Sequence, residues 1–231
     1  MKKIPLNRAL SKLGVLSRAQ ATEAILAGRV RVGGRLVRTP STLVSPEHAR
    51  IELDETRARK AAWRTILFHK PRGVVTTRTD PEGRPTIYDV LGVAGTGLIA
   101  VGRLDAATSG LLLLTTDTQL ANWLTDPQNQ VPRVYVVTVR GRVAADAITR
   151  LTGEITLRKT SGRESHLLVE LREGKNRQVR RMFSDIGHEV TSLKRVRFGG
   201  LELGSLPPGT YKEILRKEIA KAFPGAPRRE V

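Results

Sequence analysis

The 231-residue sequence contains no cysteine and few aromatic residues: two Trp, three Tyr and four Phe. The absence of cysteine excludes disulfide bonds, thiol catalysis and cysteine-ligated zinc or iron–sulfur centres. No apolar run reaches the length of a membrane span, and the basic N-terminus lacks the continuous apolar stretch of a signal peptide. These absences predict a cytoplasmic protein with no membrane partner.

Motifs for nucleotide, metal and nucleophile chemistry are also missing. The phosphate loop G-x-x-x-x-G-K-[ST] does not occur, which disfavours a nucleoside triphosphatase. The sequence has no G-x-S-x-G nucleophile elbow. Its histidines, which lack the spacing of metal ligands, are His48, His69, His166 and His188. We therefore expect neither a metal site nor a cofactor.

Acidic residues are few compared with basic ones. The chain has 40 Lys and Arg against 22 Asp and Glu, a net charge of +18. The first 60 residues alone contain 13 basic and 5 acidic residues. No basic amphipathic helix dominates, so the charge favours a nucleic acid over a membrane as the polyanionic partner.

Residues 1–58 predict a small separate domain. Leucines spaced at i, i+4 and i+7 from Leu6 predict a short helix, and Ser17 with Gln20 forms a capping box that opens a second one. Residues 30–37 predict a hairpin around Gly-Gly. The basic side chains of this domain that we expect to contact RNA are Arg18, Arg29, Arg31 and Arg35.

Residues 59–65 predict a linker and residues 66–231 a second domain. In the second domain, strand-like apolar runs outnumber helical segments and follow no regular alternation, which favours an α+β fold around a mostly antiparallel sheet. The predicted strands cover residues 66–68, 74–77, 98–101, 111–115, 134–139, 166–171 and 189–196. The predicted helices cover residues 118–124, 144–151 and 177–186.

Three polar clusters interrupt these apolar runs. GRLDAATSGLLLL, residues 102–114, places Asp105 between two apolar strands, where a carboxylate requires a partner or a hydrogen bond. A solvated Asx turn is an equally simple reading, and the pattern alone slightly favours it. REGKNRQVRRM, residues 172–182, predicts a basic helix start that faces an anion or only water. HKPRG and DPEGRPT, residues 69–73 and 80–86, are by themselves turns.

In this order, HKPRGVVTTRTDPEGRPT, GRLDAATSGLLLLTTD and REGKNRQVRRM followed by GHEVTSLKRVRFGGL resemble the RsuA/RluB/RluE/RluF-type ribosomal RNA pseudouridine synthases. Residues 3–53 resemble the alpha-L RNA-binding domain of that family, and the likeness extends to about Ile214. The resemblance implies a small alpha-L domain followed by a pseudouridine synthase domain with a mixed, mostly antiparallel sheet. It also implies isomerisation of a uridine in ribosomal RNA to pseudouridine without cofactor or metal.

The resemblance further implies roles for single residues. Asp105 matches the catalytic aspartate, Tyr135 the tyrosine that stacks on the target base, and Arg180 the basic residue that pairs with the aspartate. The expected substrate pocket comprises Arg103, Leu104 and Leu193. Further expected RNA contacts in this domain are Lys70, Arg84, Lys175, Arg177 and Arg181.

The substrate has alternatives. DPEGRPT resembles the members that act on large-subunit (23S) RNA, but a small-subunit (16S) enzyme remains an alternative. A non-catalytic RNA-binding ribosome-assembly factor fits the charge equally well, although a binder does not need Asp105, Tyr135 and Arg180 together. The expected partner is ribosomal RNA or a pre-ribosomal particle, bound by a monomer.

Overall fold

The computed structural model describes residues 3–16, 18–59 and 62–227. The chain divides into two compact units. The first, here called the front unit, comprises residues 1–63 with 116–118, and the second, the main unit, comprises residues 64–115 with 119–231.

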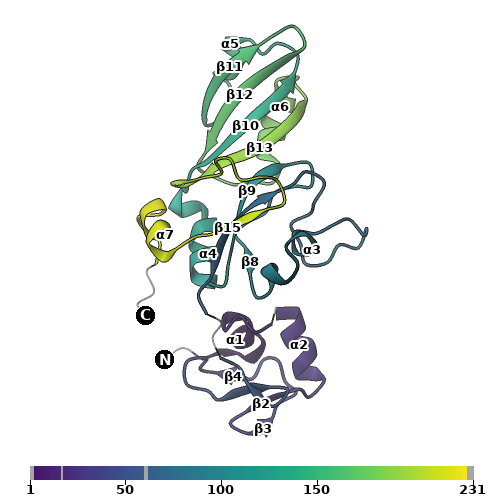
Figure 1. Ribbon diagram of the computed structural model, residues 1–231, viewed down its shortest axis with the longest axis vertical. Helices are drawn as coiled ribbons and strands as arrows, with labels where there is room; N and C mark the ends of the chain where they lie inside the picture. The colour runs from purple at the N-terminus through teal and green to yellow at the C-terminus, as the bar shows by residue number, and fades with distance from the viewer. Residues whose placement is uncertain (1–2, 17, 60–61, 228–231) are drawn as a thin grey trace. The chain divides into compact units, whose positions relative to one another are not determined.

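The described part of the front unit contains two short helices and two small sheets (Figure 1). Its elements are β1 (Ile4–Pro5), α1 (Leu6–Lys12), α2 (Arg18–Leu26), β2 (Val30–Val32), β3 (Arg35–Leu36), β4 (Leu43–Val44), β5 (Ile51–Leu53) and β6 (Thr56–Arg57). β1 pairs with β4, and the other sheet has the order β3-β2-β5-β6. The two predicted helices and the hairpin are confirmed, whereas the predicted cap at Ser17 lies outside the described residues.

Local sequence explains this unit. Leu6 and Leu10 of α1 and Ile25 of α2 are fully buried against each other and against the small sheet, as the helical spacing of apolar residues requires. Gly33 and Gly34 turn the β2–β3 hairpin with φ of 58° and 80°, a left-handed pair that only Gly, Asn or Asp adopts easily.

The main unit is built on one large sheet with short helices beside it (Figure 1). Its strands are β7 (Thr65–Lys70), β8 (Ile99–Ala100), β9 (Ser109–Thr115), β10 (Arg133–Arg140), β11 (Glu154–Thr160), β12 (Glu164–Leu171), β13 (Val190–Phe198), β14 (Leu201–Glu202) and β15 (Tyr211–Glu213). Its α-helices are α3 (Ile87–Leu91), α4 (Thr118–Thr125), α5 (Ala145–Ile148), α6 (Gln178–Asp185) and α7 (Arg216–Ala222), and its 3-10 turns are η1 (Gly92–Gly95) and η2 (Pro127–Asn129).

The sheet runs β11-β12-β10-β13-β9-β7-β15, with β14 beside β13 and β8 beside β9. Among the described strand pairs only β13 and β9 are parallel; the others are antiparallel. The mixed, mostly antiparallel sheet of the predicted α+β fold is therefore confirmed. The parallel pair joins the antiparallel half β11-β12-β10-β13 to the half that carries β9 and β7.

Two buried clusters fix the two halves of this sheet. In one, Val137 and Val169 of neighbouring strands pack with Val179 and Phe183 of α6. In the other, β7 and β9 pack against α3 through residues such as Phe68. Burial of this apolar area stabilises the sheet by about 25 cal/mol per Å² removed from water.

Sequence reasoning missed or misassigned some elements. Residues 74–77 do not form a strand, and Val75 makes only an isolated bridge with Thr86. The reason is that the Gly73 amide and the Thr76 hydroxyl donate hydrogen bonds to the loop between β8 and β9. β11 escaped prediction because most of its residues are exposed and polar, as an edge strand permits. Helix α3 is only five residues long, too short for a clear helical period, and α7 has a single large apolar residue, Ile219, from which no period can be read.

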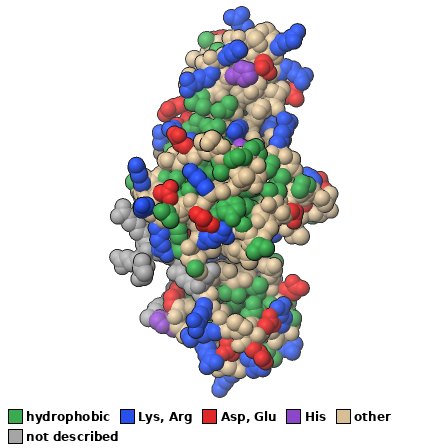
Figure 2. All heavy atoms as spheres, in the orientation of Figure 1, with side chains coloured by type: hydrophobic (Ala, Val, Ile, Leu, Met, Phe, Trp, Pro, Cys, Tyr) green, Lys and Arg blue, Asp and Glu red, His purple; other side chains and the backbone are tan. Residues whose placement is uncertain are grey.

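The surface of each unit carries many Lys and Arg side chains, with acidic and apolar side chains between them (Figure 2). The main unit also exposes single apolar residues, such as Val93 and Val136. Among the described residues, no helix has the length and apolar character that a membrane crossing requires.

Candidate active site

Asp105 lies in the loop that joins β8 to β9. The segment after β7 braces this loop: the Gly73 amide donates to the Ala106 carbonyl at 2.7 Å, and the Thr76 hydroxyl donates to the Leu104 carbonyl at 2.8 Å. Asp105 is half-buried. No described residue donates a hydrogen bond to its carboxylate, so the Asx turn that the pattern allowed is not formed. The side chain is held at the surface of a cavity instead.

Gly110 permits the close approach of β9 and β13 on which the site depends. In the parallel pairing, Gly110 is opposite Arg195. A Cβ on Gly110 would lie 2.2 Å from the Arg195 carbonyl oxygen and 2.6 Å from its amide nitrogen. The backbone φ of +110° is a further reason for glycine. The glycine of GRLDAATSG therefore allows the loop of Asp105 to end against β13.

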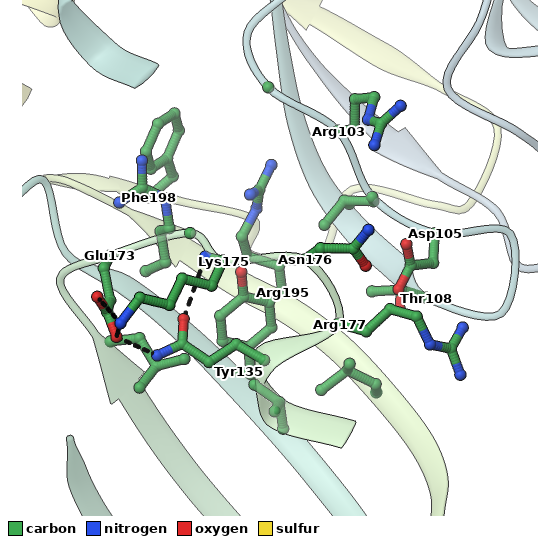
Figure 3. A pocket seen from close by; sticks show the side chains of 18 of the residues that line it. Arg103, Asp105, Thr108, Tyr135, Glu173, Lys175, Asn176, Arg177, Arg195 and Phe198 are labelled. Atoms are coloured by element: carbon green, nitrogen blue, oxygen red, sulfur yellow. Dashed lines mark hydrogen bonds and ion pairs between the residues drawn. The ribbon is translucent and has the colours of Figure 1, made fainter. Parts of the chain in front are cut away.

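A cavity of about 530 Å³ opens beside Asp105 (Figure 3). Its walls come from the Asp105 loop, from Tyr135 on β10, from Leu193 on β13 and from residues 173–179 before and within α6. The predicted site residues that line it are Arg103, Leu104, Asp105, Tyr135, Lys175, Arg177 and Leu193. The fold thus brings together most of the residues proposed for catalysis and for the substrate pocket.

Cations surround this cavity. Arg103 and Arg177 are exposed and line it. Lys175 is 2.9 Å from Glu173, and its hydrogen bond lowers the pKa of the Glu173 carboxyl. Arg177 stands at the N-cap of α6 with φ of 50°. Exposed guanidinium groups around an opening suit the phosphates of an RNA strand.

Arg180 does not form the direct ion pair with Asp105 that the resemblance implies. Its guanidinium donates to the carbonyls of Val190 at 2.8 Å and Ala107 at 3.1 Å, and no carboxylate of a described residue forms an ion pair with it. Burial lowers the pKa of Arg180, with Arg177 acting in the same direction and Asp105 opposing both. Arg180 therefore contacts the Asp105 loop through the Ala107 carbonyl, two residues from Asp105, and not through the carboxylate.

Lys70 is a correction to the expected RNA contacts. Its side chain is fully buried, and Nζ donates to the carbonyls of Pro71 at 2.8 Å and Val74 at 2.6 Å. Burial lowers the pKa of Lys70 to about 8, against the attraction of Asp105. A lysine enclosed at the end of β7 cannot reach a phosphate; it fixes the turn that braces the Asp105 loop.

The remaining predicted RNA contacts are exposed but do not line the cavity. On the front unit, Arg29 pairs with Asp54, and Arg31 donates to the Gly34 carbonyl at 3.1 Å. On the main unit, Arg84 is 2.8 Å from Asp80. The exposed residues of this group are Arg18, Arg29, Arg31, Arg35, Arg84 and Arg181.

Sequence reasoning missed two buried arginines of the cavity, Arg133 and Arg195. Arg133 could have been found, because it is two residues from Tyr135 and so on the same face of the strand. Arg195 could not have been assigned to the cavity from the sequence, because a register shift in the pairing of β10 with β13 decides which face of the sheet its side chain is on. Among the described residues, no group of three or more His, Asp or Glu could hold a metal ion.

Comparisons with known proteins agree with this geometry. The family described as RNA pseudouridylate synthase matches residues 64–185, and the S4 domain matches residues 4–51. An uncharacterized RNA pseudouridine synthase of Aquifex aeolicus is 34% identical over 96% of this chain and 95% of its own length. The ribosomal large subunit pseudouridine synthase B of Pseudomonas aeruginosa is 40% identical over 93% of this chain, which spans 60% of that relative.

A solved structure shows the same architecture. The match to a crystal structure of a pseudouridylate synthase covers 95% of this chain and 99% of that chain. The two are 28% identical in sequence, and the TM-score is 0.64. Fold and sequence together define an RNA-modifying isomerase. More narrowly, the chain belongs to the RNA pseudouridylate synthase family and carries an N-terminal S4 domain. The membership predicted from the three motifs is confirmed.

Proposed function

We propose that this chain converts a uridine of large-subunit (23S) ribosomal RNA into pseudouridine, with Asp105 as the catalytic carboxylate. The observation that carries the proposal is the convergence of Asp105, Tyr135 and Leu193 on one cavity from three distant segments. Its volume of about 530 Å³ is typical of small-molecule sites. A carboxylate, an aromatic ring and an apolar wall are the groups that a flipped-out uridine requires.

The reaction breaks the bond from ribose C1′ to uracil N1 and forms a bond from C1′ to C5. The C5 proton leaves and N1 gains a proton, so no atom or electron is lost. Positive charge develops on the sugar as the first bond breaks. The ionised Asp105 carboxylate stabilises that charge, adds to the sugar carbon, or removes a neighbouring sugar proton. Each route requires the carboxylate to touch the ribose.

Tyr135 supports the proposal from the side of the base. A uridine must leave its stack to reach Asp105, which costs a few kcal/mol and least in a loop. Stacking on an aromatic ring returns about 1–3 kcal/mol. Tyr135 is half-buried and lines the cavity, where one ring face can meet the base while Leu193 closes the wall.

Arg180 enters the proposal as a positioning residue. Its hydrogen bond to the Ala107 carbonyl fixes the Asp105 loop, and its positive charge is attracted by Asp105. Lys70 supports the same loop from the other side through the turn after β7.

The choice of large-subunit RNA rests on relatives named ribosomal large subunit pseudouridine synthase B, at 40% identity in Pseudomonas aeruginosa, 37% in Yersinia pestis and 36% in Vibrio cholerae. The S4 domain with its exposed arginines would hold the RNA through phosphates. We propose that a monomer acts, in the cytoplasm, on ribosomal RNA or on a pre-ribosomal particle.

Mapping of pseudouridine tests the proposal. Purified wild-type protein and Asp105→Asn are incubated with 23S and 16S transcripts, and ribosomal RNA is mapped from cells with and without the gene. We expect one or a few 23S positions to be modified only by the wild type. Modification of 16S RNA alone would show that the substrate is small-subunit RNA and not 23S RNA. Binding without modification by either protein would leave only an RNA-binding assembly factor.

A further inference from the structure

A β-bulge turns one arginine of β13 into the cavity. Across the β10–β13 pair, Val134 is opposite Arg197, whereas the next residue, Tyr135, is opposite Arg195. Val196 is therefore an extra residue on β13. Bulges of this kind re-aim side chains and are common beside active sites. Here the bulge leaves Arg195 on the face of Tyr135, and Figure 3 shows the two side by side.

The two arginines around the bulge have different environments. Arg197 lies on the opposite face of the sheet, where its guanidinium meets Glu170 at 2.6 Å. Arg195 is only 3% exposed, and no carboxylate of a described residue forms an ion pair with it. Its Nε donates to the Leu111 carbonyl at 2.7 Å, while its buried Nη2 has no hydrogen-bond partner among the described residues.

A second cation strengthens this unpaired charge. The Arg133 guanidinium is 5.2 Å from the centre of the Phe198 ring, and that of Arg195 is 5.1 Å from it. Arg133 uses its terminal nitrogens on the carbonyls of Val131 and Leu124. Buried charges are normally paired, and an unsatisfied donor in a native fold calls for an explanation. The pair of guanidinium groups makes this end of the cavity suited to negative charge.

The burial of Arg195 indicates which negative charge of the substrate its guanidinium would meet. Exposed Arg103 and Arg177 line the opening, where RNA phosphates remain in contact with water. Arg195 is buried and lies beside Tyr135, the ring on which the base is proposed to stack. When the N1–C1′ bond breaks, its electron pair leaves with N1 and spreads onto the uracil oxygens O2 and O4. Formation of the C5–C1′ bond, loss of the C5 proton and protonation of N1 then remove that charge.

We propose that Arg195 is a further catalytic residue, whose guanidinium donates a hydrogen bond to a carbonyl oxygen of the detaching uracil and stabilises its transient negative charge. This inference rests on the proposed function and deepens it. A fixed donor that meets charge only during the reaction accelerates the chemical step without tightening substrate binding.

The test compares Arg195→Met with the wild type in single-turnover reactions on saturated RNA, alongside RNA affinity and thermal unfolding. We expect the rate to fall about 10²–10³-fold, as for loss of one oxyanion-type donor, and the RNA dissociation constant to change less than threefold. Arg197→Met, on the same strand but the opposite face, is the control and should retain the wild-type rate. A folded Arg195→Met protein with the wild-type rate overturns the inference.

A substrate-side experiment decides the question if Arg195→Met does not fold. Wild-type enzyme receives RNA with 2-thiouridine or 4-thiouridine at the target, since sulfur accepts hydrogen bonds more weakly than oxygen. A tenfold or greater slowing at one of the two positions supports the inference, and wild-type rates at both overturn it. A different result would contradict the proposed function itself: the wild-type enzyme would form no pseudouridine on unmodified RNA.

Discussion

Gly110→Ala should disturb the site more than any other single methyl group, because of where that methyl would lie. The added Cβ would be 2.2 Å from the Arg195 carbonyl oxygen. The Cβ is fixed to its own backbone and the oxygen belongs to the backbone of β13, so no side-chain rotation can relieve the contact. β9 and β13 would have to separate at their parallel pairing. The loop of Asp105 ends at β9, so the carboxylate should move with it.

The magnitude follows from two contributions. A non-glycine residue at a φ of +110° costs on the order of 1–3 kcal/mol. Overpacking against fixed atoms costs roughly a further 1–3 kcal/mol. Gly187→Ala separates the backbone contribution from the overpacking contribution. Gly187 also has a positive φ, +81°, but an added Cβ there would meet no atom within 4 Å, so this variant has only the backbone cost.

Urea unfolding and single-turnover kinetics measure both effects. We expect Gly110→Ala to lose about 1–3 kcal/mol more unfolding free energy than Gly187→Ala, or roughly 2–12 °C in midpoint temperature. Only Gly110→Ala should slow pseudouridine formation. Equal destabilisation by the two variants, with equal rates, would refute the argument that close approach of β9 and β13 positions Asp105.

Three further predictions concern single side chains. Burial lowers the pKa of Lys70 to about 8 from 10.5, so between these pH values the unfolded chain holds a proton that the folded chain has lost. The unfolding free energy of the wild type, relative to Lys70→Met, should therefore rise from pH 8 to 10.5, on the order of 3 kcal/mol; a flat difference in denaturant titrations would contradict the burial of the amine. Arg180→Ala should reduce the single-turnover rate more than RNA affinity, because Arg180 holds the Ala107 carbonyl; weak binding with intact chemistry would exclude a positioning role. Tyr135→Phe should keep most activity and Tyr135→Ala lose about 1–3 kcal/mol of stacking, whereas a severe loss in the phenylalanine variant would assign a role to the hydroxyl.

Much of the fold could be read locally. The leucines of α1 and the Gly-Gly hairpin were predicted because periodicity and turn chemistry act over a few residues. Residues 74–77 show the limit of such patterns. This β-branched run does not join the sheet, because the Gly73 amide and the Thr76 hydroxyl bond to the loop of Asp105.

Part of the candidate site could also be read from the motifs. Asp105 and Tyr135 were proposed from the resemblance alone, and the structure sets both around one cavity. The one partner that the motifs implied, Arg180 for Asp105, donates instead to the carbonyls of Val190 and Ala107. The basic motif predicts that Lys70 contacts RNA, but its side chain is buried. The prediction is wrong because the sequence around a lysine at the end of a strand does not show whether its side chain points inward or outward.

The sequence by itself determined most of the helices and strands, the basic charge and the motifs, because propensities and residue types are properties of short segments. Only the tertiary structure decided which groups meet. The pairing of β9 with β13 joins residues 85 positions apart in the sequence, and the bulge at Val196 forms where β13 pairs with β10, about 60 positions away. A shift of one residue turns every side chain to the other face. The inward direction of Arg195, and with it the chemistry proposed for the detaching base, follows from that register.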